Sequence, residues 1–254
     1  MRYTDIIFDL YGTLVDIHTD ENDTVWEKTA FFLGFHGALY TAEELKKEFI
    51  SKMKLREAHA GQNYECFPDI PFETVLEDLF REKGIYQDVE RLAFHAAQLF
   101  RISSLEYIRL YPKVRETLSS LRGRGCRVWL LSNAQRVFTE YELRYLGLLD
   151  SFGGIYISSD HMCRKPDRRF FDAMIDGRGL DREKCLMIGN DRNTDIGGAW
   201  NAGLDTLYIH TDLTPRDQPG ADPALHPLLV PNAHHTEMEG WDPDIISRLP
   251  DIFQ

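Results

Sequence analysis

The sequence predicts an α/β fold in which a doubly wound parallel sheet is interrupted by an inserted all-helical cap domain. Short, almost wholly apolar segments recur along the chain and alternate with amphipathic segments of helical period. This pattern is typical of strands that are buried on both faces by helices. A long block after the first apolar segment lacks such strands. With 43% hydrophobic residues among 254, the chain can also bury a sizeable core.

Polar residues with possible chemical roles follow the first four of the five expected strands. These strands are residues 5–8, 128–131, 154–158, 185–188 and 206–209. Asp9 follows the first strand and Ser132 the second, while Lys165 and Asp191 come after the third and the fourth. In open parallel sheets, ligands bind beyond the carboxyl ends of the strands. We therefore expect these four side chains to lie at one edge of the sheet.

Helical signals fill the block between the first strand and Pro112. Thr41 and Glu44 have the spacing of a capping box, Pro71 opens a second helix, and residues 89–100 carry a third. Pro112 itself suits the first position of a helix that belongs to the sheet domain.

These signals define the domain organisation that we expect. Residues 1–15 and 109–254 form the α/β core, and residues 16–108 form the helical cap, which could cover the strand ends and exclude water. Residues 212–240 are rich in Pro, Asp and His and are expected to be irregular, with a short helix following at 243–249.

Composition argues against several classes of function. The formal net charge is −12, so the long-range field repels nucleic acid. No apolar run approaches the roughly 18 residues that span a bilayer, and no signal peptide is evident, so we expect a cytoplasmic protein with no membrane partner. The four cysteines are widely scattered, which favours reduced thiols over a disulfide framework or a structural zinc site.

Four ordered segments carry the chemistry. They are "DLYGTL" at 9–14, "LLSN" at 130–133, "RKPD" at 164–167 and "IGNDRNTDIGGAWNAG" at 188–203. In order, spacing and position at strand ends, they resemble the four motifs of the haloacid dehalogenase (HAD) superfamily. The helical insertion after the first segment resembles the subfamily I cap. The resemblance implies a Rossmann-like core and a hydrolase that uses an aspartate nucleophile.

The resemblance implies a role for the polar side chains of the first three motifs. Asp9 would be the nucleophile that forms a covalent aspartyl intermediate, and the Thr13 hydroxyl would fix the loop or the nucleophile. Ser132 and Asn133 would bind substrate, and Lys165 would also neutralise charge on the substrate and the nucleophile. Taken singly, these residues have plainer interpretations as caps, turn residues or a solvated lysine. The ordered set favours catalysis.

The fourth motif adds carboxylates to the same edge. Asp191 and Asp195 lie four residues apart near the start of an expected helix, so both can face one pocket. With Asp9 they would repel one another unless protons or a cation intervene, and Mg²⁺ prefers oxygen ligands. In the family's phosphatases the ion binds the nucleophile, the main-chain oxygen two residues later and an acid of this motif. The resemblance thus implies a Mg²⁺ site of Asp9, Tyr11, Asp191 and Asp195. Because Asn190 stands where an acid is common, Asp191 could bind directly and Asp195 through water; helix capping is the plainer alternative.

Tyr11 occupies the position of the second aspartate of the family's phosphatases, which protonates the leaving group. A phenol, with a pKa of about 10, is a poor base at neutral pH. "DLYGTL" is most similar to the L-2-haloacid dehalogenases, in which halide departs without a proton, whereas the acidic fourth motif favours a phosphatase. We expect a Mg²⁺-dependent phosphatase that acts on a small phosphomonoester, and therefore a small anionic, phosphorylated substrate.

Two alternatives stay open at this point. A 2-haloacid dehalogenase needs a clamp for the substrate carboxylate, for which Arg56, Arg81 and Arg91 of the cap are candidates, although each also suits a solvated helix face. A protein that binds a phosphorylated ligand or a partner with little turnover would not need Asp9 to react.

Overall fold

The computed structural model describes residues 3–60, 66–215 and 236–238, and the helix expected at 243–249 lies outside them. The elements, in chain order, are β1 (Asp5–Phe8), β2 (Val15–Thr19), α1 (Asp23–Phe35), α2 (Ala42–Ala60), α3 (Phe72–Glu82), α4 (Val89–Ser104), β3 (Leu105–Leu110), α5 (Val114–Gly123), β4 (Arg127–Ser132), α6 (Arg136–Tyr145), η1 (Leu149–Ser151), β5 (Gly154–Ile157), α7 (Ser158–His161), α8 (Arg168–Arg178), η2 (Arg182–Lys184), β6 (Cys185–Gly189), the π-helix η3 (Arg192–Gly197), α9 (Gly198–Asn201), β7 (Asp205–Ile209) and β8 (Thr236–Met238).

The central sheet has the order β5-β4-β1-β6-β7-β8, and every neighbouring pair is parallel. Strand β1 therefore lies between β4 and β6. Alternate residues of β1 face opposite sides, as the pleat requires. Ile6 and Phe8 pack in the apolar cluster that contains α5 and α6, while Ile7 packs in the cluster that contains α8. The doubly wound α/β fold is confirmed.

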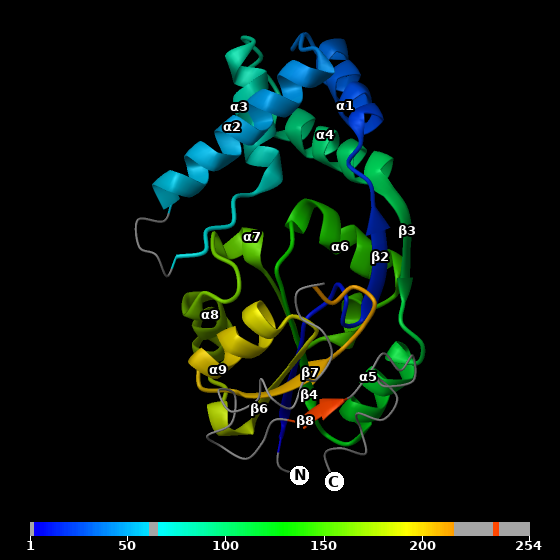
Figure 1. The fold of residues 1–254 in the computed structure, drawn as a ribbon, viewed down its shortest axis with the longest axis vertical. Helices are drawn as coiled ribbons and strands as arrows, with labels where there is room; N and C mark the ends of the chain where they lie inside the picture. The colour runs from blue at the N-terminus through cyan, green and yellow to red at the C-terminus, as the bar shows by residue number, and fades with distance from the viewer. Residues whose placement is uncertain (1–2, 61–65, 216–235, 239–254) are drawn as a thin grey trace.

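Helices α1–α4 gather beyond the carboxyl end of β1, at the top of Figure 1. Their buried faces form one apolar core, which includes Trp26, Phe49, Leu79 and Phe100 and reaches Val137 of α6. We call these four helices the cap. The expected capping box is present at the start of α2: the Thr41 amide donates to Glu44 Oε2 at 2.9 Å, and the Glu44 amide donates to Thr41 Oγ1 at 3.2 Å.

A two-stranded antiparallel ribbon of β2 and β3 joins the cap to the sheet domain (Figure 1). The expectation that residues 16–108 are helical throughout is therefore wrong at both ends. Val15 pairs with Leu110, and Asp16 pairs with Arg109, whose guanidinium contacts the Asp16 carboxylate at 2.6 Å. Polar and apolar residues are mixed in each strand because one face of the ribbon is exposed. The two strands that pair also lie at opposite ends of the insertion. No local signal could reveal the ribbon.

The expectation of an irregular chain over 212–240 is also incomplete. Within it, β8 (Thr236–Met238) pairs in parallel with β7 and extends the sheet by one strand. A three-residue strand is too short to produce a period that can be recognised in the sequence.

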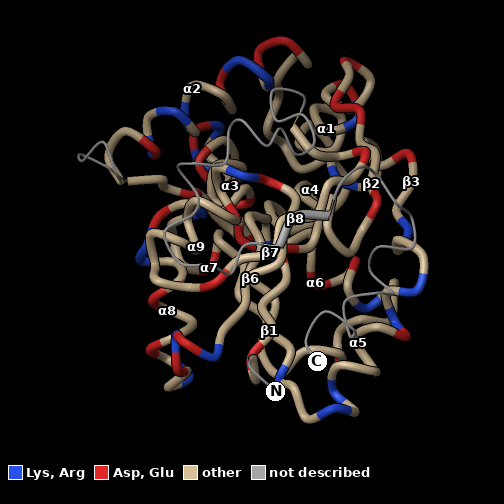
Figure 2. Tube along the Cα trace, turned by 60° about the horizontal axis from the view of Figure 1, so that its bottom comes forward, with Lys and Arg blue, Asp and Glu red and all other residues tan. Residues whose placement is uncertain are grey.

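In the view of Figure 2, acidic and basic residues are interspersed along the described elements. Among the described residues, no helix combines the length and apolarity needed to cross a bilayer. All four cysteines fall in the described ranges and are free thiols, as expected.

Residues 66–71, which precede α3, contact the sheet domain. Asp69, 8% exposed, accepts hydrogen bonds from the Ser158 hydroxyl of α7 and, at 2.9 Å, from Gln135 Nε2 before α6. The Gln135 amide oxygen in turn accepts the Phe72 amide at 2.8 Å. Burial raises the pKa of Asp69, although the hydrogen bond from Ser158 opposes the shift.

We predict that Asp69→Asn removes a pH dependence of stability. The pKa of Asp69 in the folded protein exceeds the unfolded value of about 3.9. Above about pH 4, the unfolded chain therefore binds fewer protons at this residue than the folded protein does. The unfolding free energy of the wild type should fall relative to the variant until the folded pKa is passed, and should then level off. Urea unfolding over a pH series measures this difference. Exposed Asp23→Asn is the control; a difference that rises with pH would contradict the prediction.

Candidate active site

Asp9 lies directly after the central strand β1, with a side chain 9% exposed. Its amide donates to the Ile188 carbonyl of β6 at 2.9 Å, so the backbone at Asp9 is still held by the sheet. Thr13 Oγ1 donates to Asp9 Oδ2 at 3.1 Å. Both contacts hold the carboxylate at the strand end.

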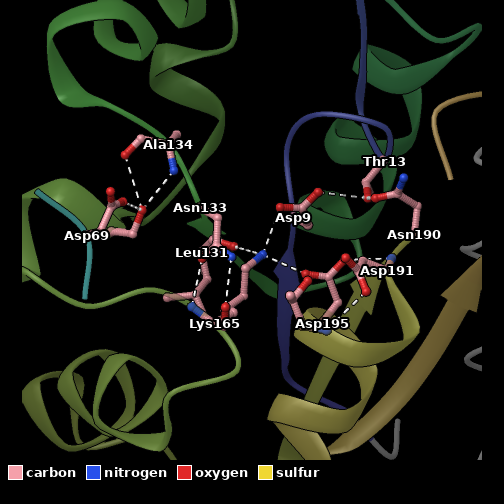
Figure 3. Close-up of polar contacts among 12 residues, drawn as sticks. Asp9, Thr13, Asp69, Leu131, Asn133, Ala134, Lys165, Asn190, Asp191 and Asp195 are labelled. Carbon is pink, nitrogen blue, oxygen red and sulfur yellow. Dashed lines mark hydrogen bonds and ion pairs between the residues drawn. The ribbon is translucent and has the colours of Figure 1, made fainter. Parts of the chain in front are cut away.

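Lys165 is buried, with its side chain 1% exposed, and its ammonium group lies at the centre of the site (Figure 3). Nζ donates to Asp9 Oδ1 at 2.8 Å, to Asp195 Oδ1 at 2.7 Å and to the Leu131 carbonyl at 2.8 Å. Burial alone would lower the pKa of this amine, but the Asp195 and Asp9 carboxylates outweigh it and raise the pKa. Lys165 is therefore a permanent cation shared by two acids.

One cation faces two carboxylates here, so the buried group Asp9, Lys165 and Asp195 has a net negative charge when both carboxylates are ionised. Burial raises the pKa of Asp195 to about 7, against the lowering effect of Lys165 and with a further raising effect of Asp9. Either a proton or an additional cation can supply the missing positive charge.

Two glycines permit the close approach of these groups. Gly12 has φ of +81°, and a Cβ there would lie 2.2 Å from Asn190 Nδ2. A Cβ on Gly189 would lie 2.2 Å from Asp195 Oδ2. Any larger residue at either position would displace a polar side chain of the site.

The three polar residues of the fourth motif do not face the site equally. Asn190 is 5% exposed, and its Oδ1 accepts a hydrogen bond from Thr13 Oγ1 at 3.3 Å. Asp191 is half-buried and caps η3, with Oδ1 accepting the amides of residues 193 and 194. Asp195 uses Oδ2 to accept the Asp191 amide at 3.0 Å. Across the described chain, no group of three or more His, Cys, Asp or Glu is placed to hold a metal.

Ser132 and Asn133 follow β4 and differ in their surroundings. Ser132 is fully buried, and its Oγ has no hydrogen-bond partner among the described residues. A buried hydroxyl without a partner is costly, so this atom is available to a ligand. The Asn133 amide instead holds the backbone of Lys165, since Oδ1 accepts its amide at 2.7 Å and Nδ2 donates to its carbonyl at 3.0 Å.

The Tyr11 side chain is engaged by helix α6. Its hydroxyl donates to Glu142 Oε2 and lies 3.0 Å from Thr139 Oγ1. Burial, followed by the charge of Glu142, raises the pKa of Tyr11 well above its usual range. The phenol therefore stays protonated and cannot serve as a base.

The three cap arginines that the sequence offered as a clamp pair with acids of the cap or its margin. Arg56 contacts Asp78, Arg81 contacts Glu77, and Arg91 contacts Asp88. These partners lie within or next to the cap helices, so the three guanidinium groups are not directed at Asp9.

Sequence reasoning missed two groups that support the site. Thr211, after β7, donates from Oγ1 to the Gly12 carbonyl at 2.6 Å, and Glu142 binds Tyr11 from the middle of α6. Glu142 lies on a helical segment with other charged residues, so no periodicity marks it as buried. Only the tertiary arrangement identifies these two residues.

A protein-family comparison decides the class of this chain. The model described as haloacid dehalogenase-like hydrolase matches residues 6–203. The chain belongs to this family. It is therefore a HAD-like hydrolase, and the resemblance drawn from the four motifs is confirmed.

Several curated relatives align over most of this HAD-like hydrolase. A glyceraldehyde 3-phosphate phosphatase of Methanothermobacter thermautotrophicus is 25% identical over 97% of this chain and 96% of its own length. A 5'-nucleotidase of Pseudomonas aeruginosa is 26% identical over 89% and 91%, respectively. An (S)-2-haloacid dehalogenase of Pseudomonas sp. strain YL is 26% identical over 81% and 82%. Relatives of both chemistries are thus similar to this chain.

Solved structures of a dehalogenase and a phosphatase share the fold of this chain. A 2-haloacid dehalogenase from Pseudomonas syringae pv. Tomato DC3000 matches with a TM-score of 0.59 and 18% identity, over 99% of this chain and 98% of that one. A HAD phosphatase from Thermococcus onnurineus matches with a TM-score of 0.55 and 17% identity, over 100% and 98%. At these identities the comparison bears on the fold alone.

We predict that Lys165→Met destabilises the protein by roughly 3–5 kcal/mol, because it leaves the Asp9 and Asp195 carboxylates buried without a cation. Adding Asp195→Asn should restore part of the loss, since it removes one of the two charges. Guanidinium unfolding at pH 8 measures both effects. Lys184→Met removes a half-exposed lysine and is the control. A Lys165→Met variant as stable as the wild type would be incompatible with this account.

Proposed function

We propose that this HAD-like hydrolase is a divalent-metal-dependent phosphatase that acts on a small phosphomonoester, with Asp9 as the nucleophile. The observation that carries the proposal is the buried group of Asp9, Lys165 and Asp195, in which two carboxylates share one ammonium group, an arrangement that fits a site that takes up a further cation. The unpartnered hydroxyl of Ser132 fits an oxygen of an anionic substrate. Names of several relatives, among them the phosphatase and the 5'-nucleotidase, agree with this choice.

The proposed reaction assigns each step to a residue. An Asp9 carboxylate oxygen attacks phosphorus, an acyl phosphate forms, and the bond to the leaving oxygen breaks. Lys165 neutralises Asp9 and the phosphoryl oxygens, while Ser132 holds one of those oxygens. Water then attacks the intermediate and releases phosphate and free Asp9. Because the Tyr11 phenol is bound to Glu142, we assign no proton transfer to it; solvent protonates the leaving alkoxide and accepts the proton of the attacking water.

The chain offers oxygen donors that suit Mg²⁺, which takes few carboxylates and accepts amide and carbonyl oxygens. We propose Asp9, the main-chain oxygen of Tyr11 and the side-chain oxygen of Asn190 as ligands. Asp191 and Asp195 would support the site from outside, because Asp191 caps η3 and Asp195 binds the Lys165 ammonium group and the Asp191 amide. When bound, Mg²⁺ would add positive charge next to the phosphoryl group.

We predict that p-nitrophenyl phosphate is hydrolysed in the presence of Mg²⁺ and that EDTA suppresses the activity. Asp9→Asn should lower kcat by at least about 10³-fold, as expected when a nucleophile is lost. Release of p-nitrophenol measures both effects. Exposed Asp150→Asn is the matched control. Hydrolysis that is indifferent to EDTA would rule out the metal-dependent mechanism.

A second prediction identifies the metal ligand of the fourth motif. Asn190→Ala should raise the Mg²⁺ concentration for half-maximal activity by about 10-fold or more. Asp191→Asn should change it little, because asparagine also caps a helix. Mg²⁺ titrations of the two variants make the comparison. The reverse order of effects would assign the ligand to Asp191.

The dehalogenase function is the second candidate, and Tyr11 favours it, because halide departs from carbon without a proton. Chloride release from L-2-chloropropionate without added metal is the assay that separates the two candidates. Release together with inert p-nitrophenyl phosphate would replace the phosphatase proposal.

A further inference from the structure

Glu142 is a buried acid that links two parts of the molecule. Its side chain is 6% exposed, and it lies on α6, outside the group around Lys165. Oε1 accepts a hydrogen bond from Arg101 Nε at 2.6 Å, and Oε2 accepts one from Arg101 Nη2 at 3.2 Å and one from the Tyr11 hydroxyl. A buried carboxylate held by three donors has a fixed position.

The first link leads to the loop that follows Asp9. Tyr11 is two residues from Asp9, and its hydroxyl contacts Thr139 and Glu142 of α6. The loop is tightly hydrogen-bonded, since the amides of residues 13, 14 and 15 all donate to the Leu10 carbonyl. Fixing the phenol therefore fixes the backbone that carries both Asp9 and the Tyr11 carbonyl.

The second link leads to the cap. Arg101 lies in the last turn of α4, shortly before β3, with a side chain only 18% exposed. Beside it, a cavity of about 570 Å³ separates parts of α4 and β3 from α6. The ion pair of Arg101 and Glu142 lines this cavity and joins α4 to α6 beside the apolar contact of Val137 with the cap core. The guanidinium also lies 5.3 Å from the centre of the Phe138 ring.

We propose that Glu142 is a positioning residue that couples the cap, through Arg101, to the loop of Asp9, through Tyr11. The coupling rests on the proposed function only in that Asp9 is taken as the nucleophile. The Tyr11 hydroxyl thus fixes the position of the loop after Asp9 relative to the cap, and it does not transfer a proton to the leaving group.

The test combines Tyr11→Phe, Glu142→Gln and the double variant, assayed on p-nitrophenyl phosphate and on phenyl phosphate. Each single variant should lower kcat by about 10-fold or more, because small displacements of a nucleophile are costly. The loss should be equal for the good and the poor leaving group. The double variant should lose little more than the worse single variant, because both changes break one network.

Glu140→Gln is the matched control, since Glu140 is a half-exposed acid on the same helix that pairs with Arg144. It should leave kcat unchanged. A Glu142→Gln variant that behaves like this control overturns the proposal. A decrease in kcat that is confined to phenyl phosphate also overturns it, because the network would then act as a proton donor. So does a double variant whose decrease in kcat is the full product of the two single decreases.

A second measurement does not depend on activity. Amide hydrogen exchange in the loop of residues 12–15 should be faster by about 10-fold or more in both single variants, and exchange in the last turn of α4 should be faster in Glu142→Gln. Exchange in β6 should not change. If the wild type hydrolyses neither ester, the proposed function fails, and exchange still decides the coupling; unchanged exchange in the loop overturns it. If Glu142→Gln does not fold, Tyr11→Phe, which keeps the ion pair, carries the test.

Discussion

The ammonium group of Lys165 is the constraint on which the strand-end arrangement depends. It binds Asp9 after β1, Asp195 in η3 and the Leu131 carbonyl of β4, so three segments distant in sequence meet at one atom. A buried charge is tolerated only where partners surround it. The glycines at 12 and 189, and the Asn133 amide that holds the Lys165 backbone, all keep these partners within reach.

Much of the fold could be predicted because its signals are local. The strands of the sheet are short apolar runs, and the capping box at Thr41 is a pattern of four residues. The ribbon of β2 and β3 could not be predicted, since Val15 acquires its partner Leu110 only after the cap has been formed between them. For the same reason, β8 is recognisable only beside β7.

The candidate site divides in a similar way. The sequence brought Asp9, Thr13, Lys165 and Asp195 to one edge, because motifs at the ends of parallel strands must converge there. It could not rank Asn190 against Asp191, since neighbouring residues at a strand end can point in different directions. It also offered no reason to connect Tyr11 with Glu142 and Arg101, because these residues belong to the loop after β1, to α6 and to α4 and meet only in the folded protein.

The position of β1 has a consequence for the order of events during synthesis. This strand is synthesised well before its neighbours β4 and β6, which begin at Arg127 and Cys185. The cap helices are synthesised between β1 and β4 and contact one another over short sequence separations. They can therefore pack together before β4 and β6 are available to pair with β1. Asp9, the proposed nucleophile, is therefore translated before the cap but reaches its final surroundings only after Lys165 and Asp195 have been added.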